Sequence, residues 1–235
     1  MAKDFMGVWY KMESFLREYD ASKYEHPSVT VDILIFSKNA QNQLSVLLMK
    51  RSEEPFKEKL ALPGGFVGIE ESLEDCVNRV LKSKLNLVNL KTEQLYTFGS
   101  VNRDPRTRVI SVAYFCLLPN QEVIKESNTL FWVPLNSLNF TELAFDHKDI
   151  INVGKERIKG KLDYTLIGFD MVKNKQRFTI YELQKVFECI QEKKLDTPNF
   201  RRMFTNKYLN SGIVKKTGEK CNDFRPSDYY KLVEE

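Results

Sequence analysis

Two kinds of hydrophobic pattern alternate along the first two thirds of the chain. Residues 29–36 (VTVDILIF) and 44–50 (LSVLLMK) are rich in β-branched and other apolar residues and flank a polar turn, which predicts a β-hairpin. Residues 107–118 (TRVISVAYFCLL) predict a long strand, and residues 130–133 (LFWV) predict a shorter one. Strands of this kind, with helical segments between and after them, predict an α+β sheet domain.

Helical spacing begins directly after Ser72. The apolar residues between positions 73 and 81 recur at the spacing of one helix face, so this helix is expected to lie on a core. Ser72 is followed three residues later by Asp75, a pair that resembles a capping box. Residues 149–161 also predict a helix, and residues 7–20 are compatible with a short amphipathic one.

The pattern changes again near the C-terminus. Residues 178–193 (FTIYELQKVFECIQEK) predict a strongly amphipathic helix that begins with the capping box of Thr179 and Glu182. A short connection leads to a second helix, residues 198–209, for which Thr197 is the expected N-cap. Two strands joined by a basic, glycine-containing turn (TGEK) follow. Helix, turn, helix and hairpin is the layout of a winged helix-turn-helix.

The predicted organisation has four parts. They are an N-terminal helix or extension (1–24), a sheet domain (25–162), a linker (163–176) and a winged-helix domain (177–235). Residues 175–235 hold 13 Lys and Arg against 9 Asp and Glu, so the whole net charge of +4 lies in this part. A basic terminal module on a neutral body predicts contact with a polyanion such as nucleic acid, although a solvated basic face has the same composition.

Cysteine usage and hydropathy narrow the class of protein. The four cysteines, Cys76, Cys116, Cys189 and Cys221, are far apart and form no CxxC pair, which favours a reducing compartment over a disulfide framework or a zinc site. No apolar run is long enough for a membrane span, and the N-terminus lacks the features of a signal peptide. The protein is therefore expected to be cytoplasmic, with no membrane partner.

A glycine-rich loop followed by a helix occupies residues 62–87. This segment resembles the Nudix box. The residues at the spacing of that box are Gly65, Glu71, Arg79, Leu81 and Leu87, and the sequence LPGG leads into it as it does in the family. Val80, Ser83 and Lys84 replace the glutamates that this family uses as metal ligands, and Asn86 replaces the late glycine. Positions 80, 83 and 84 share one helix face, so the face that presents carboxylates to Mg²⁺ in a Nudix hydrolase carries none here.

These substitutions argue against ordinary Nudix hydrolysis, and no catalytic or metal-binding residue is predicted. Lys84 would repel a divalent ion, since two like unit charges ~4 Å apart cost about 4 kcal/mol at an effective dielectric of ~20. Four acids at the helix start offer an alternative metal site: Glu70, Glu71, Glu74 and Asp75. Acids in a first helical turn are more simply explained by the helix dipole and the cap. The loop and the helix start still offer backbone N–H groups to an anionic ligand.

A second cluster of charged residues surrounds Pro105. The cluster comprises Arg103, Asp104, Arg106 and Arg108. Its pattern fits a polar turn that leads into a strand, and it fits equally a set of guanidinium groups for phosphate or sugar hydroxyls. The charge and spacing of these residues leave both interpretations open.

The order of these motifs along the chain is specific. A degenerate Nudix box, an RDPRxRV stretch and a tail with FTxxELQ, NFRR, TGEK and RPxxYY run from about Tyr24 to Leu232 and resemble the Nudix-related transcriptional regulators of bacteria. The resemblance implies a Nudix-like α/β/α sandwich with a mixed sheet, followed by a winged helix-turn-helix domain. It also implies a homodimer, operator DNA as a partner, and a small effector such as ADP-ribose or a sugar. No cofactor is predicted.

Two sets of site residues follow from these motifs. The predicted effector-binding residues are Arg51, Gly64, Gly65, Phe66, Arg103, Asp104, Arg106 and Arg108. The predicted DNA-binding residues are Thr197, Asn199, Arg201, Arg202, Lys207, Lys215, Lys216, Lys220 and Arg225. The second helix is expected to read bases in the major groove, while the hairpin lysines touch phosphates. The alternative function is a Nudix hydrolase of ADP-ribose-like nucleoside diphosphate compounds with unconventional metal ligation.

Overall fold

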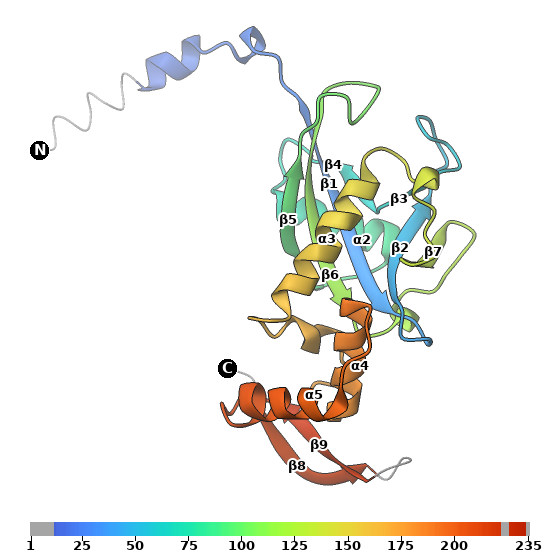
Figure 1. Ribbon diagram of the computed structural model, residues 1–235. Helices are drawn as coiled ribbons and strands as arrows, with labels where there is room; N and C mark the ends of the chain where they lie inside the picture. The colour runs from blue at the N-terminus through green and yellow to red at the C-terminus, as the bar shows by residue number, and fades with distance from the viewer. Residues whose placement is uncertain (1–11, 222–225, 234–235) are drawn as a thin grey trace, which may run out of the picture.

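The computed structural model describes residues 12–221 and 226–233 and places a sheet domain above a winged-helix domain (Figure 1). A helix of residues 12–18 and the short 3-10 helix η1 (Ala21–Lys23) extend away from the sheet domain and are exposed. The helix expected over residues 7–20 is therefore present from residue 12, and the first residues of that range lie outside the described part.

A seven-stranded mixed sheet forms the centre of the first domain. Its strands are β1 (Ser28–Lys38), β2 (Leu44–Lys50), β3 (Leu60–Ala61), β4 (Gly64–Phe66), β5 (Glu93–Phe98), β6 (Val109–Leu118) and β7 (Leu130–Pro134). The main path has the order β3-β2-β1-β6-β5, with β4 also paired to β1 and β7 to β2. Only β1 and β6 are parallel among these described pairs. This central pair is buried on both faces, which explains its nearly continuous apolar sequence.

Helices α2 (Leu73–Leu85) and α3 (His147–Lys161) cover opposite faces of the sheet (Figure 1). Successive residues of a strand point to opposite faces, so Ile33 of β1 joins the core beneath α2 and Leu34 joins the core beneath α3. The prediction of an α/β/α sandwich around a mixed sheet is confirmed.

Local sequence sets the two ends of α2. The Ser72 hydroxyl accepts a hydrogen bond of 3.1 Å from the Asp75 N–H, and the Asp75 carboxylate accepts one of 3.3 Å from the Ser72 N–H, as the capping box predicted. Asn86 ends the helix in the left-handed conformation, with a φ of 53°. Val80 is buried, as expected for a member of the apolar face of this helix.

The C-terminal domain is a winged helix, as predicted. Its elements are α4 (Ile180–Gln191), α5 (Thr197–Phe204), the π-helix η5 (Thr205–Leu209), β8 (Val214–Cys221) and β9 (Ser227–Leu232). The rings of Phe187 on α4 and Phe200 on α5 meet edge to face, with 5.2 Å between their centroids. This contact holds the two helices of the helix-turn-helix together.

Two details of this domain differ from the sequence prediction. The N-cap of α5 is Asp196 rather than Thr197: its carboxylate accepts a hydrogen bond of 3.0 Å from the Asn199 N–H, and the helix dipole favours a carboxylate there. The TGEK stretch lies inside β8, where Gly218 has a φ of 88° at a shift of register, so it forms a bulge and not the hairpin turn. The connection between β8 and β9 falls outside the described residues.

The segment 163–176, predicted as a linker, is packed against both domains. It contains the 3-10 helix η4 (Ile167–Met171), in which Phe169 is buried. The Phe169 ring lies 5.5 Å from the Phe178 ring and 5.2 Å from the Tyr208 ring, between centroids. One hydrophobic cluster therefore continues from the sheet domain into the winged helix. The apolar residues of this predicted linker therefore pack against partners that lie far away in sequence.

Two further 3-10 helices, η2 (Gln121–Val123) and η3 (Phe140–Glu142), lie in the loops that flank β7. In the parts of the chain that the structure describes, no helix combines the length and the apolar character that crossing a membrane requires.

Candidate functional site

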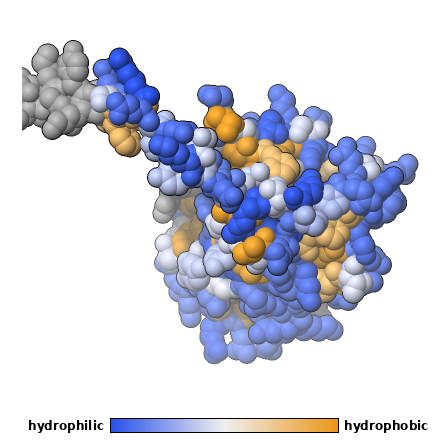
Figure 2. Space-filling view, turned by 90° about the horizontal axis from the view of Figure 1, so that it is seen from above, coloured by the Kyte–Doolittle hydropathy of each residue, from blue (hydrophilic) through white to orange (hydrophobic). Residues whose placement is uncertain are grey.

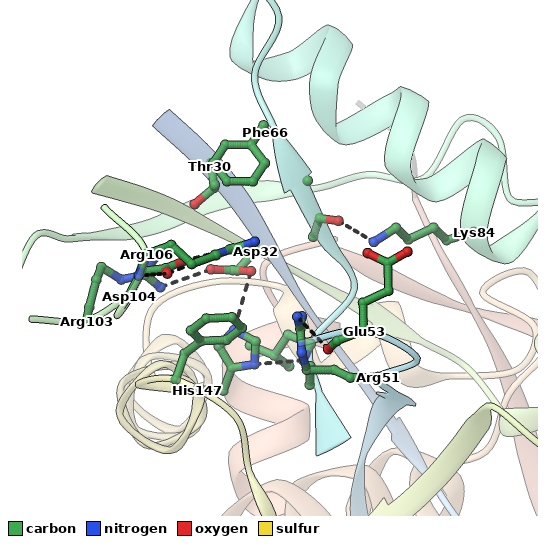
Figure 3. A pocket seen from close by; sticks show the side chains of 15 residues that line it. Thr30, Asp32, Arg51, Glu53, Phe66, Lys84, Arg103, Asp104, Arg106 and His147 are labelled. Carbon is green, nitrogen blue, oxygen red and sulfur yellow. Dashed lines mark hydrogen bonds and ion pairs between the residues drawn. The ribbon is translucent and has the colours of Figure 1, made fainter. Parts of the chain in front are cut away.

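A polar cavity of about 240 Å³ lies between β1, β4, the last turn of α2 and the first turn of α3 (Figure 3). Charged side chains and two phenylalanine rings line it. The lining residues are Thr30, Asp32, Arg51, Glu53, Ala61, Leu62, Gly64, Gly65, Phe66, Lys84, Arg103, Asp104, Arg106, Phe145 and His147. The pairing of β4 with β1 requires glycine at position 64, because a Cβ there would lie 2.4 Å from Asp32 Oδ1.

A buried ionic network surrounds Arg103. Its Nε and Nη2 donate to the two carboxylate oxygens of Asp146 at 2.9 and 2.7 Å, and Nη2 also lies 3.3 Å from Asp32 Oδ2. The Ser111 hydroxyl donates to the same Asp32 oxygen at 2.6 Å. Only 3% of the Arg103 side chain is exposed, and the two carboxylates balance the positive charge that is buried there. The network ties the loop before β6 to β1 and to the start of α3.

His147, the first residue of α3, completes this network. The Leu62 N–H donates to its Nδ1 at 3.0 Å, so Nδ1 carries no hydrogen and the ring hydrogen lies on Nε2. Nε2 is 3.5 Å from Asp32 Oδ1. Burial by itself would raise the pKa of Asp32, but the imidazole, hydroxyl and guanidinium groups around the carboxylate lower it to about 2. Asp32 is therefore an anion that accepts hydrogen bonds.

Guanidinium groups and aromatic rings form another part of the wall. The Arg106 guanidinium lies 5.6 Å from the Phe66 ring centroid and 5.9 Å from that of Phe145, and it donates to the Asp104 carboxylate at 3.0 and 2.7 Å. The Arg51 guanidinium lies 4.9 Å from the Phe145 centroid and donates to backbone carbonyl groups of the neighbouring loop. Rings flanked by cations suit a planar heterocycle attached to an anionic group.

Three of the four acids at the start of α2, Glu71, Glu74 and Asp75, already have partners within the protein. Arg79 Nε donates to Glu71 Oε2 at 2.9 Å, and this ion pair, together with a backbone N–H, lowers the pKa of Glu71 to about 2. Asp75 caps the helix, and Glu74 accepts a hydrogen bond of 3.1 Å from the Tyr114 hydroxyl. Over residues 12–221 and 226–233, no group of three or more His, Cys, Asp or Glu side chains is arranged to hold a metal ion. These residues do not fit the Mg²⁺ that Nudix hydrolases use.

The cavity gathers most of the predicted effector-binding residues. Those that line it are Arg51, Gly64, Gly65, Phe66, Arg103, Asp104 and Arg106. Arg108 lies apart, because its guanidinium donates to the carbonyl oxygens of Gly99 and Ser100 at 2.8 and 3.0 Å and closes the loop before β6. The polar and aromatic lining residues that the prediction missed are Thr30, Asp32, Glu53, Lys84, Phe145 and His147. Asp32 had a signal in the sequence, since it is the only charged residue in the run VTVDILIF.

Two basic residues of the winged helix, Arg201 of α5 and Lys220 of β8, lie together at one hollow. The exposed members of the predicted DNA-binding set are Thr197, Asn199, Arg201, Arg202, Lys215, Lys216 and Lys220. Arg201 and Lys220 line one hollow together with Tyr181, a residue that is 66% exposed. The first helix of the motif therefore adds an aromatic side chain to this hollow that the sequence interpretation did not include.

Some members of this set have partners inside the protein. The Thr197 hydroxyl accepts a hydrogen bond of 3.2 Å from Gln184 Nε2, which ties α5 to α4. Lys216 forms an ion pair with Asp228 across the hairpin. Arg225 lies outside the described residues.

Lys207 faces the sheet domain and not the face of Arg201 and Lys220. Its ammonium donates to the carbonyl oxygens of Leu162 and Asp163, at 3.0 and 2.7 Å. Leu162 follows α3 as its C-cap, so Lys207 satisfies carbonyl groups at a helix end, where a positive charge is favoured.

Comparisons with known proteins agree with this architecture. Residues 26–153 match the NUDIX domain family, and residues 175–232 match the NrtR DNA-binding winged helix domain. The chain is 36% identical over 227 residues to the ADPR responsive transcriptional repressor NtrR of Acinetobacter baylyi, covering 94% of this chain and 88% of that protein. It is 35% identical over 155 residues to an ADP-ribose pyrophosphatase of Methanocaldococcus jannaschii, covering 64% of this chain and 87% of that protein.

Crystal structures of Shewanella oneidensis NrtR show the same folds. NrtR in complex with a 27mer DNA has a TM-score of 0.75 and 33% identity, covering 87% of this chain and 93% of that one. Its NUDIX domain in complex with ADP ribose has a TM-score of 0.55 and 35% identity, covering 62% of this chain and 97% of that one.

Proposed function

Since the chain belongs to the Nudix-related family of transcriptional regulators, with a NUDIX domain followed by an NrtR-type winged helix, we propose that it is a repressor that releases operator DNA when ADP-ribose binds. One observation carries the proposal. The wall of the polar cavity includes the first residue of α3, and the other end of this helix contacts the winged helix.

ADP-ribose offers groups that match two parts of the cavity. Its adenine is a planar heterocycle suited to the rings of Phe66 and Phe145 and to the guanidinium of Arg106. Its diphosphate is an anion suited to Arg51 and Lys84, which form no ion pair with any carboxylate of the described residues. The wall thus offers different surfaces to the adenine and to the diphosphate.

Binding without hydrolysis is part of the proposal. Glu71 is paired with Arg79 and Asp75 caps α2, so neither carboxylate is free to hold a divalent ion beside the diphosphate. The alternative is a hydrolase of ADP-ribose-like compounds, and the similarity to the ADP-ribose pyrophosphatase of M. jannaschii favours it. The engaged acids weigh against that alternative, because metal-assisted attack of water on a diphosphate requires oxygen ligands for the metal.

Helix α3 provides a route between the two proposed binding sites. Its first residue, His147, and the preceding Asp146 belong to the buried network of the cavity. With a rise of ~1.5 Å per residue, this helix is roughly 22 Å long. Towards its other end, Lys155 and Lys159 lie 2.6 and 3.2 Å from Glu192, the C-cap of α4. A ligand that shifts the start of α3 would therefore favour one arrangement of the winged helix over another.

We assign DNA reading to α5 and expect two copies of the chain to act together. Arg201 is suited to bidentate recognition of guanine, and a two-fold dimer matches a palindromic operator. The N-terminal helix supports a dimer, because Figure 2 shows it standing away from the body of the molecule. Apolar side chains are exposed there at helical spacing, namely Met12, Phe15, Leu16 and Tyr19. A second copy would cover this apolar face.

Fluorescence anisotropy with a duplex selected by the protein from a random library tests the proposal. ADP-ribose should weaken binding of the labelled duplex about tenfold or more, a coupling typical of allosteric proteins, whereas ribose 5-phosphate should have little effect. Unchanged affinity would refute ADP-ribose as the effector. Turnover of ADP-ribose with Mg²⁺ above ~1 s⁻¹, the low end of ordinary enzyme rates, would establish the hydrolase instead.

A further inference from the structure

We infer that the ammonium group of Lys84 occupies the place of a divalent cation beside the bound diphosphate, so that this chain binds its effector independently of Mg²⁺. The inference rests on the proposed function, since it concerns how the same cavity recognises the same anion. It goes further because it makes one side chain responsible for the metal requirement of the protein.

Lys84 reaches the cavity from the last turn of α2. Its Nζ donates a hydrogen bond to the carbonyl oxygen of Gly64, the first residue of β4 (Figure 3). An ammonium group has three hydrogens, so this contact fixes its position and leaves two donors for a ligand oxygen. Gly64 packs directly against Asp32, so the carbonyl that anchors Lys84 is part of the rigid β1–β4 pair.

The charge balance of the cavity leaves Lys84 available for an anion. Arg103 is matched by two carboxylates and Arg106 by Asp104. For Lys84, by contrast, none of the carboxylates in the described residues lies within ion-pair distance. Arg51 is in the same situation, since its guanidinium donates to backbone carbonyls. Outside these ion pairs, the described cavity wall holds two cations, Arg51 and Lys84, and one carboxylate, that of Glu53, so a net positive charge is available to a diphosphate.

The environment of the ammonium makes an anionic partner favourable. Although the residue as a whole is exposed, burial around its charged end lowers the pKa of Lys84. The positive charges of Arg51 and Arg79 lower this pKa further, and the charge of Asp32 opposes them. A phosphate oxygen beside Nζ would offset both the desolvation and the repulsion, so ligand binding would stabilise the charged form.

The carboxylates nearby do not supply a competing metal site. Glu71 is held by Arg79, and Asp32 accepts from Ser111 while it faces Arg103. Oxygen ligands for Mg²⁺ must come from several groups at once, and in the described parts of the chain no cluster of three candidate ligands exists. A divalent ion placed near Gly64 would also meet the positive charge of Lys84. The groups around this position therefore favour the ammonium of Lys84 over a metal ion.

Isothermal titration of the full-length protein with ADP-ribose, in excess EDTA and in millimolar Mg²⁺, tests the inference. The two dissociation constants should agree within about twofold, which corresponds to much less than the ~1.4 kcal/mol of a tenfold change in affinity. Lys84→Met keeps the length of the side chain and removes its charge, and it should weaken binding about tenfold or more in both buffers, as expected for the loss of a charged hydrogen bond. Lys84→Arg should retain most of the affinity.

A reversed charge gives the sharpest outcome. Lys84→Glu should bind ADP-ribose very weakly in EDTA and should regain affinity with Mg²⁺, because a carboxylate beside the diphosphate needs a cation between them. Lys82→Met is the matched control, since Lys82 is exposed on the same helix and does not line the cavity. Its affinity should equal that of the wild type.

The possible failures are distinguishable. Wild-type binding that requires Mg²⁺, or Lys84→Met binding that equals the wild type, would overturn the inference and leave the proposed effector intact. Absence of ADP-ribose binding in both buffers would overturn the proposed effector and the inference with it. Retained binding of operator DNA by each variant would show that the altered chains are folded.

Discussion

The ammonium of Lys207 donates a hydrogen bond of 2.7 Å to the carbonyl oxygen of Asp163, across the boundary between the winged helix and the sheet domain. Asp163 lies just beyond the end of α3, whose first residue lines the polar cavity. The charge of Lys207 suggested a contact with DNA, but this lysine connects the winged helix to the helix that begins at the cavity.

Lys207→Met should weaken the coupling between effector and operator more than it weakens operator binding itself. The substitution keeps the apolar stem and removes the donor that ties η5 to the end of α3. The ratio of operator affinities without and with ADP-ribose should fall about threefold or more, within the range of mutations that modulate coupling. Anisotropy titrations of one duplex in both conditions give this ratio.

Lys215→Met is the matched control for this experiment. Lys215 is exposed on β8, so its loss should lower both affinities and leave their ratio unchanged. If Lys207→Met instead lowered both affinities equally, Lys207 would be a DNA contact, as its charge alone suggested.

Arg201→Ala should change the sequence preference of DNA binding, whereas Lys215→Ala should change only its strength. Arg201 is exposed on α5 and faces a hollow with Lys220, so its removal should cost about 1–3 kcal/mol and relax sequence preference at one base position. Lys215→Ala should weaken all sequences about equally and lower the salt slope by about one unit. Titrations of matched and mismatched duplexes at several salt concentrations measure both effects. Equal loss of discrimination in both variants would refute α5 as the reading helix.

Asp32 should make the stability of the protein fall in acid. Its folded-state pKa of about 2 lies below the ordinary value of 3.8. Because folding lowers the pKa of this carboxyl, its ionised form stabilises the folded state at any pH above the pKa of the unfolded chain. This stabilisation is lost as pH falls from 3.8 towards 2. The lost free energy of unfolding should be about 2 kcal/mol, since one pKa unit corresponds to about 1.4 kcal/mol.

Urea denaturation across this pH window, for the wild type and for Asp32→Asn, measures that contribution. The two proteins should differ most near neutral pH, where the carboxylate is ionised, and the difference should shrink below pH 3.8. Parallel stability curves would show that the buried network does not hold Asp32 in its charged form.

Leu16→Ser should shift the protein from dimer towards monomer. Leu16 is 60% exposed on a helix that stands away from the sheet domain, so its apolar surface is expected to be buried only against a second copy. Light scattering coupled to gel filtration measures the mass at several protein concentrations. Tyr164→Ser, an exposed apolar position far along the chain, should leave the mass unchanged. A monomeric wild-type protein would refute the proposed dimer.

The sequence predicted the elements of this fold because their signals are local. The capping boxes at Ser72 and Thr179 act within one helical turn, and the nearly continuous apolar run of β1 is typical of a strand buried on both faces. The spacing of Gly65, Glu71 and Arg79 likewise identified the loop and helix at the cavity. Asp196 was missed as the N-cap of α5 because Thr197 and Pro198 form an equally plausible start on sequence alone.

Taken by itself, the sequence determined that a mixed-sheet Nudix fold precedes a winged helix, and that the carboxylates at the metal-binding positions of the box are absent. Only the tertiary structure decided which cations have partners. Arg103 meets Asp32 and Asp146, and Lys207 meets the end of α3, whereas Lys84 faces the cavity and forms no ion pair with a carboxylate of the described residues. The reason is physical. A charged residue can be read from the sequence, but folding brings its partner from a segment tens of residues away. Whether that partner is present determines whether the charge is structural or available to a ligand.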